Sequence, residues 1–250
     1  MARAGHILAA LIALAGSLGC CCPAFAPNRP IVIQPPPVVL EAPPVVVEPP
    51  REQKPVAPQP AMPAVAGPRT FDLISIIDLK WDVVDGPTKW QMQGNQLQCI
   101  EGNFVPRVQI PYVPPIEYDF IVSFSQPALR NGISLIMPKP GGGMFFWYLG
   151  SNGGSGYGFS ADPANKGGDV PGLIKANTTH VTAVQVRQGG VKAFVDGKQL
   201  LEHRTDFRDL KSDNWRQMRN ERLLGVACDD PATFHRIQIV EVTGNGKAAR

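Results

Sequence analysis

The stretch EYDFIVSFS, from Glu117 to Ser125, decides the fold class. Successive side chains of a β-strand point to opposite faces, so this stretch presents two different faces. One face is wholly apolar and the other largely polar: Tyr118, Phe120, Val122 and Phe124 form the first, and Glu117, Asp119, Ile121 and Ser123 the second. This alternation predicts a strand of an antiparallel sheet that covers a hydrophobic core with one side.

Short apolar or alternating segments, separated by turn residues, lie on both sides of this strand. Gly94-Asn95 and Asp196-Gly197 are two-residue hairpin signals. We expect further strands at residues 89–93, 96–101, 105–112, 133–137, 144–149, 180–187, 191–195, 198–203, 223–228 and 234–242. Helical turns are expected only near residues 79–84 and 209–217. So many strands with so little helix predict an all-β antiparallel sandwich, or jelly roll.

Proline divides the chain of 250 residues unevenly, because 14 of the 26 prolines lie between Pro27 and Pro68. Such a density favours polyproline II and no packed core, so residues 21–68 are expected to form a tether, either a semi-rigid spacer or a disordered connector of no particular length. The sandwich domain is placed at residues 69–244, and residues 245–250 are expected to be a disordered tail. The net charge of +3 leaves no basic footprint for nucleic acid.

The first 20 residues are typical of an export signal. The stretch Ile7–Leu18 is uncharged and mainly apolar, and it is too short to cross a hydrocarbon core of ~30 Å as a helix. The sequence SLGC that follows resembles a bacterial lipobox ending at Cys20, and Cys21 is a second candidate for lipidation. Cleavage after Ala26 is the rival interpretation. We therefore expect an exported, lipid-anchored envelope protein that contacts the membrane only through its lipid, or alternatively a secreted or periplasmic one.

Two cysteines, Cys99 and Cys228, fall within the expected domain. In an exported protein they could form a disulfide. Both also lie in apolar runs, where cysteine is a common small buried residue, so two separate thiols are the alternative. The sequence contains neither a CxxC pair nor a cluster of cysteine and histidine, and we expect no metal and no cofactor.

Several motifs together carry a resemblance to a known family: Ile76–Leu79, Trp90 with Leu97, Pro115–Phe120, Val184–Arg187, Val191–Lys198 and Phe234–Ile237. They are similar to the concanavalin A-like lectin/glucanase superfamily, and more narrowly to the 3-keto-disaccharide hydrolase-like domain of exported bacterial proteins. The resemblance implies two curved sheets whose concave face commonly holds a carbohydrate. It does not by itself imply catalysis.

The glucanases of that superfamily use an E-x-D-x-x-E strand. Glu117 and Asp119 match its first two positions, but Val122 occupies the third. Retaining hydrolysis needs two carboxyl groups about 5 to 5.5 Å apart around the scissile bond, and here the acid is missing. If the protein is an enzyme, Glu117 or Asp119 would act with His203 or His235 as acid and base. Otherwise these carboxylates belong to a solvated strand face.

Aromatic residues provide the best signal for binding. In the run FFWY, from Phe145 to Tyr148, both faces of the expected strand are apolar, so one face needs either a cover or a ligand. The glycine-rich residues 150–158 are expected to form a flexible loop beside it. The candidate ligand-binding residues are Trp147, Tyr148, Asn152, Tyr157 and Trp215.

These observations lead to one functional prediction with two alternatives. We expect a domain that binds a glycan or a cell-envelope polymer without catalysis. The alternatives are a sugar-processing enzyme of the 3-keto-disaccharide hydrolase type and a purely structural envelope protein.

Overall fold

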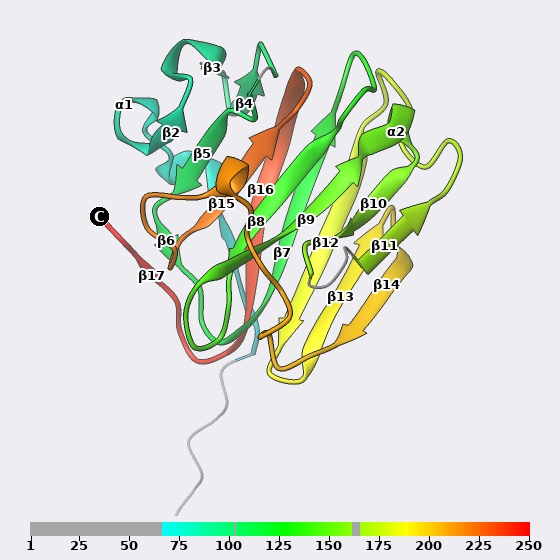
Figure 1. Ribbon diagram of the computed structural model, residues 1–250. Helices are drawn as coiled ribbons and strands as arrows, with labels where there is room; N and C mark the ends of the chain where they lie inside the picture. Colours follow the sequence, from blue (N-terminus) through cyan, green and yellow to red (C-terminus); the bar gives the residue numbers. More distant parts are fainter. Residues whose placement is uncertain (1–66, 103, 162–165) are drawn as a thin grey trace, which may run out of the picture. The chain divides into compact units, whose positions relative to one another are not determined.

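Two large antiparallel sheets pack face to face in the computed structural model, which describes residues 67–102, 104–161 and 166–250 (Figure 1). The expected signal, the candidate lipidation residues Cys20 and Cys21, and most of the expected tether lie outside the described residues. The stretch Met62–Arg250 forms one compact unit. Both sheets and the whole described core belong to this unit, as the sequence predicts for an all-β sandwich.

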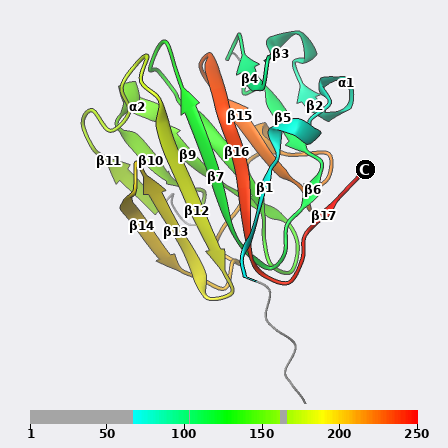
Figure 2. The same ribbon diagram turned by 180° about the vertical axis from the view of Figure 1, so that it is seen from behind.

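Sheet A has the strand order β14-β13-β12-β7-β16-β4-β3, and β1 also pairs with β16 (Figure 2). Its strands are β1 (Arg69–Asp72), β3 (Trp90–Gln93), β4 (Gln96–Cys99), β7 (Glu117–Ser125), β12 (His180–Arg187), β13 (Gly190–Val195), β14 (Lys198–Arg204) and β16 (Ala232–Thr243). Strand β7 lies near the middle of the sheet, which is why its sequence pattern is so regular.

Sheet B has the order β11-β10-β9-β8-β15-β5-β2. Its strands are β2 (Val83–Asp85), β5 (Arg107–Ile110), β8 (Ile133–Pro138), β9 (Met144–Gly150), β10 (Gly156–Phe159), β11 (Lys166–Asp169) and β15 (Leu224–Cys228). A separate ribbon pairs β6 (Tyr112–Val113) with β17 (Lys247–Ala248). The helical turns are η1 (Ile74–Ile76), α1 (Leu79–Asp82), η2 (Pro87–Lys89), α2 (Ser151–Gly154) and η3 (Asn214–Arg216).

The hydrophobic core lies between the two sheets. The apolar face of β7 is buried there, which confirms the alternation in the sequence. Rings from sheet B meet this face: Trp147 and Phe159 lie 4.9 Å apart between ring centroids. Burial of each large side chain of this kind contributes about 1.5 to 3 kcal/mol. Burial of the inward-facing apolar side chains therefore provides much of the stability of the sandwich.

Two expectations about chain ends and loops are wrong. Residues 150–158, expected to be a flexible loop, instead contain the turn α2 and the first three residues of β10, because backbone pairing to β9 and β11 holds residues 156–158 in a strand. Residues 245–250, expected to be disordered, include β17. The Arg250 guanidinium also forms an ion pair of 2.5 Å with Asp82, which is almost fully buried.

A disulfide joins the two sheets. Cys99 ends β4 in sheet A and Cys228 ends β15 in sheet B, and their sulfur atoms are bonded to each other across the core. The alternative of two separate thiols is therefore wrong for this fold. The bond closes a loop between residues 129 positions apart in the sequence.

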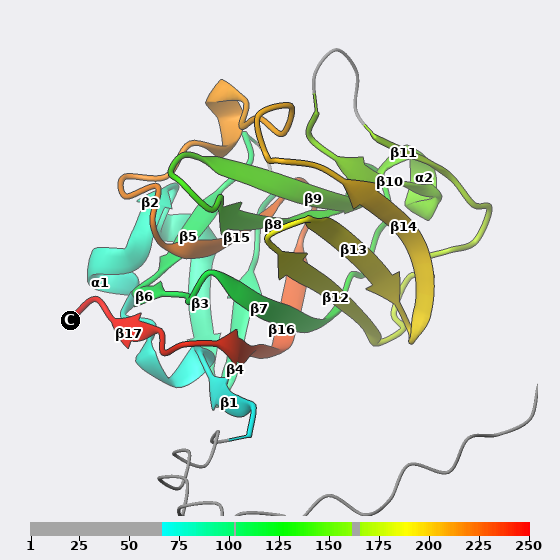
Figure 3. The same cartoon turned by 90° about the horizontal axis from the view of Figure 1, so that it is seen from below.

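Residues 205–223, here called the cover loop, connect β14 to β15 across the side of sheet B that faces away from sheet A (Figure 3). Two of its apolar side chains, Phe207 and Leu210, are buried with the core residues. Near its other end Met218 packs against Ile136 on the outer side of sheet B. The loop is thus anchored at both ends, with residues 211–217 between the anchors.

Candidate functional site

The strand register places a row of residues across the outer face of sheet B. Cross-strand pairs connect Arg107 to Ala227, Ala227 to Ser134, Ser134 to Tyr148, and Tyr148 to Gly158. Five strands, from β5 to β10, contribute to this row. Because side chains directly opposite in a sheet share a face, all of them project away from the core.

Tyr148 lies flat against β10 because its neighbour there is glycine. A Cβ atom added at Gly158 would lie only 2.6 Å from the Tyr148 hydroxyl oxygen and 2.8 Å from the ring carbon that bears it. The Tyr148 ring therefore occupies the space that a side chain at position 158 would fill. The residue remains partly exposed to solvent. Burial, together with the nearby Asp169, raises the pKa of the Tyr148 phenol. The hydroxyl stays protonated and can donate a hydrogen bond.

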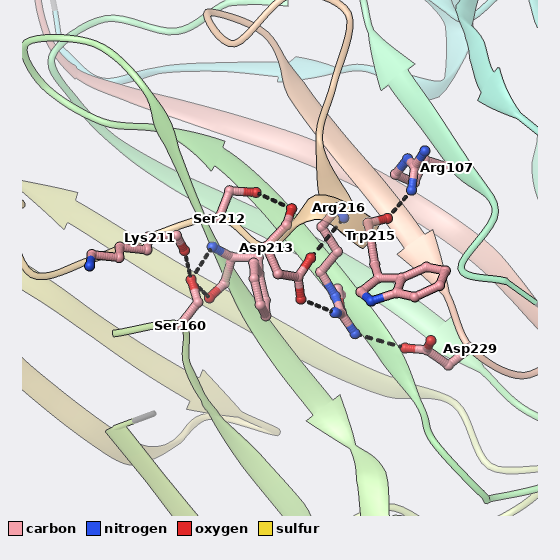
Figure 4. A network of polar contacts seen from close by, with 10 residues as sticks. Arg107, Ser160, Lys211, Ser212, Asp213, Trp215, Arg216 and Asp229 are labelled. Atoms are coloured by element: carbon pink, nitrogen blue, oxygen red, sulfur yellow. Dashed lines mark hydrogen bonds and ion pairs between the residues drawn. The ribbon is translucent and has the colours of Figure 1, made fainter. Parts of the chain in front are cut away.

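Arg216 of the cover loop joins this row from above (Figure 4). Its Nε donates to Ser134 Oγ at 2.9 Å, and its two terminal nitrogens donate to Asp213 at 2.6 Å and Asp229 at 3.1 Å. The guanidinium carbon lies 4.5 Å from the centroid of the Phe146 ring, a cation–π arrangement. Arg216 thus fastens the middle of the cover loop to strands β8 and β9.

The charged groups around Arg216 are partly withdrawn from water. Burial raises the pKa of the Asp229 carboxyl, and Arg216 opposes that rise only in part. Burial also lowers the pKa of Arg107, whose guanidinium donates to the backbone carbonyl of Trp215. Perturbed pKa values in a concave region are a feature of functional sites as well as of structural ion pairs.

A pocket of about 300 Å³ opens between the cover loop and the ends of β9 and β10. Its lining residues are Phe146, Ser160, Ala161, Lys211, Ser212 and Asp213. Ser160 Oγ accepts from the backbone N–H of Phe146 and donates to the carbonyl of Lys211, so the backbone holds this edge in place. The site therefore combines an aromatic surface, hydroxyl groups and the ion-paired side chains of Arg216, Asp213 and Asp229.

Trp147, a predicted ligand residue, cannot contact a ligand. It is fully buried between the sheets, and its indole Nε1 donates to Thr182 Oγ1 at 3.1 Å. Tyr157 packs against it on the same inner side, with ring centroids 5.8 Å apart. The prediction for Trp147 is wrong because Trp147 pairs with Leu135 and Phe159, both core residues.

The other three predicted ligand residues have different surroundings. Tyr148 lies on the outer face of sheet B as described. Trp215 is 60% exposed on the cover loop, directly before Arg216. Asn152, in the turn before β10, donates to Asp169 at 3.1 Å. The structure thus places Tyr148 and Trp215 over the same sheet face, whereas Trp147 and Tyr157 face the other way.

Glu117 and Asp119 lie on the outer face of sheet A, which is the opposite side of the sandwich. Asp119 forms an ion pair of 2.6 Å with Arg187, and Glu117 accepts from the backbone N–H of Gln188. This is the arrangement of a solvated strand face with neighbouring hydrogen bonds. The side chains that bond to Asp119 are those of Arg187 and Gln185, and Glu117 bonds to the backbone, so neither carboxylate is paired with a histidine.

The two histidines considered for catalysis are also engaged elsewhere. His203 bonds Asp209 at 2.7 Å, and His235 bonds Ser125 at 2.9 Å on sheet A. Within the described ranges, no three side chains of histidine, cysteine, aspartate or glutamate gather closely enough to hold a metal ion. Over those same ranges, no helix has the length and apolar character needed to cross a membrane.

Sequence reasoning missed Ser134, Asp213, Arg216 and Asp229. Residues 203–222 are rich in arginine and aspartate, a composition typical of a solvated segment. The spacing of Asp213 and Arg216 was a usable signal, since three residues apart suits a local ion pair. Nothing in the sequence indicates that Ser134 and Asp229, on other strands, would complete the cluster.

The architecture is a two-sheet antiparallel sandwich, the fold class that the sequence predicts. No family model and no curated protein matches the sequence. Solved structures match in fold. The VIP36 exoplasmic/lumenal domain in its Ca²⁺/Man3GlcNAc-bound form has a TM-score of 0.44 and 8% identity, over 63% of this chain and 82% of that one.

Two bacterial structures match at a similar level. The carbohydrate binding module CBM66 from Bacillus subtilis has a TM-score of 0.44 and 10% identity, over 62% of this chain and 92% of that one. A provisionally assigned glycosyl hydrolase from Parabacteroides distasonis has a TM-score of 0.44 and 9% identity, over 70% and 100%. At such identities the likeness concerns the fold alone.

Proposed function

We propose that this protein is an exported, lipid-anchored envelope protein whose sandwich domain binds carbohydrate on the outer face of sheet B without catalysis. The observation that carries the proposal is the Tyr148 ring lying over Gly158 beside the polar cluster of the cover loop. A sugar ring has one or two faces made mainly of C–H groups and a rim of hydroxyl groups. An aromatic surface with polar neighbours suits both.

The polar neighbours supply the complementary hydrogen bonds. The Asp213 side chain is 37% exposed and accepts, while the Tyr148 hydroxyl can donate; Ser212 Oγ donates to the Asp213 carbonyl and can accept from a ligand. Because Arg216 holds Asp213 in one position, a hydroxyl group that binds there need not order a mobile side chain. Trp215, exposed on the same loop, provides a second apolar surface.

The carboxylates at the proposed site, Asp213 and Asp229, are not arranged as a glycosidase requires. Asp213 and Asp229 both accept from the same guanidinium. A glycosidase needs one protonated carboxylic acid and one free carboxylate on opposite sides of the bond that breaks. Asp229 is largely buried and bonded to Arg216, so of these two carboxylates Asp213 is the one that a bound sugar can readily contact.

A glycan array with residues 62–250, the compact unit that holds both sheets and the disulfide, tests the binding. We expect Tyr148→Ala to weaken binding at least about tenfold, which corresponds to about 1.4 kcal/mol. Tyr157→Ala is the matched control, because the same side chain is removed from the inner side of the adjacent strand. If no glycan binds, or if both variants bind as the wild type does, the proposal is wrong.

Two further measurements test the absence of catalysis and the lipid anchor. Mass spectrometry of each bound glycan after prolonged incubation should show no product. Labelled fatty acid should be incorporated into the full chain in a bacterial host and lost when Cys20 and Cys21 are both replaced by alanine. Retention of the label in that double variant would place lipidation elsewhere.

A further inference from the structure

A second pocket, of about 320 Å³, lies between β1 with its following turn η1 and the β6–β17 ribbon. Figure 3 shows β1 and the ribbon along the same side of the domain. None of its lining residues belongs to the outer face of sheet B or to the cover loop. It is therefore separate from the carbohydrate site proposed above.

The interior of this pocket is apolar. Its walls are formed by Phe71, Leu73, Ile76 and Tyr112, with Ala248 at the edge. The rings of Phe71 and Tyr112 lie 6.0 Å apart between centroids and are tilted by 40°. Pockets for small ligands usually measure about 300 to 1,000 Å³, so this volume suits one or two fused or linked rings.

A buried carboxylate holds the pocket in shape. The side chain of Glu241 is only 1% exposed, and it accepts from the Tyr112 hydroxyl at 2.5 Å and from Arg69 Nε at 2.8 Å. It also accepts from the backbone N–H of Gly246. The same carboxylate thus fixes a wall residue, a charged residue at the opening and the start of the C-terminal segment. A ligand would meet groups that are already in place.

Donors outnumber acceptors at the opening. The Arg69 side chain is 45% exposed and lies over the Phe71 ring at 5.2 Å, and Lys247 is exposed on the ribbon. The carboxylate of Asp72 also lines the pocket, but it accepts from the backbone N–H of Ile74. Arg69 is already paired with the buried Glu241, so Lys247 and the remaining N–H groups of Arg69 are the donors that a ligand can reach, and Asp72 is the exposed carboxylate beside them.

We propose that this pocket binds a small amphipathic anion, with its aromatic rings packed against Phe71, Ile76 and Tyr112 and an acidic group at Arg69 and Lys247. The apolar walls remove the rings from water, and the two cationic side chains pair with the acidic group. The site needs no part of the sugar-binding face, so the two sites can be occupied independently.

Two dyes with related ring systems test this in residues 62–250. 8-Anilinonaphthalene-1-sulfonate carries a sulfonate, whereas N-phenyl-1-naphthylamine has the same rings without it. Fluorescence titration should show one site per chain and tighter binding of the sulfonate. We expect Lys247→Gln to weaken the sulfonate dye about five- to tenfold and to leave the neutral dye unchanged. Lys198→Gln, at an exposed lysine of β14, is the control.

Ala248→Trp should fill the pocket and reduce binding of both dyes more than about twentyfold. Ala249→Trp, at the neighbouring exposed position that does not line the pocket, is the matched control. If Ala248→Trp folds and binds the dyes as the wild type does, the pocket is not the site. If Lys247→Gln changes nothing and the neutral dye binds as tightly as the sulfonate, the assignment of an anion is wrong. The lysine variant gives its result even where the tryptophan variant does not fold.

Discussion

Removal of the disulfide should cost the domain much of its stability. Cys99→Ala with Cys228→Ala releases a cross-link between residues 129 positions apart. In the chain-entropy description, closing a loop of that length lowers the entropy of the unfolded chain by the equivalent of about 5 kcal/mol at 25 °C. Measured losses for native disulfides are about 2 to 5 kcal/mol. We therefore expect the free energy of unfolding to fall by about 3 to 5 kcal/mol.

Urea unfolding of residues 62–250, followed by tryptophan fluorescence, measures this difference. For a domain of this size each kcal/mol shifts the Tm by about 2 to 4 °C, so in a thermal melt the Tm should fall by roughly 6 to 20 °C. Wild-type protein unfolded in the presence of a reducing agent should behave like the double variant. Both sulfur atoms are buried, so a reducing agent should reach the bond only after the protein unfolds.

Two results would refute this reasoning. One is a double variant within about 1 kcal/mol of the wild type, which would show that the cross-link restricts the unfolded chain little. The other is titration of two free thiols in denatured, unreduced protein, which would show that the bond between the sheets does not form.

Three further predictions concern other parts of the molecule. Gly158→Ala should displace the Tyr148 ring and weaken glycan binding several-fold, whereas Gly189→Ala, at a glycine with open space around it, should not; equal binding by both would contradict the role of the ring. Glu241→Gln should lower stability by about 3 to 5 kcal/mol, because it leaves a buried network with one partner missing. Burial opposes ionisation of Glu241, but hydrogen bonds from its partners outweigh it and lower the carboxyl pKa. The ionised Glu241 therefore stabilises the fold at pH values above its ordinary pKa of about 4.5, and this stabilisation is lost as the pH falls through the lowered pKa. The free energy of unfolding of Glu241→Gln, measured with urea, should depend less on pH across that range than that of the wild type. Deletion of residues 245–250 should cost about 1 to 3 kcal/mol in the same assay, whereas a disordered tail would cost nothing.

Strands with side-chain alternation were predictable to the residue. The expected bounds of the strands at residues 117–125 and 180–187 agree with β7 and β12. The missed strands lack that signal. Strand β10 alternates glycine with aromatic residues, and β11 reads KGGD, so neither has the branched side chains typical of strands. Backbone pairing to neighbours makes them strands, and pairing is a property of the folded chain.

The run FFWY is enough to predict that strand β9 has two apolar faces, because successive side chains of a strand point to opposite sides. Phe145 and Trp147 form one face, and Phe146 and Tyr148 form the other. Which of the two faces is buried in the core depends on contacts between β9 and other strands. Pairing of Trp147 with core residues of β8 and β10 turned it inward, and the cover loop brought Arg216 onto Phe146. Contacts between residues far apart in the sequence depend on register and loop path, and local alternation specifies neither.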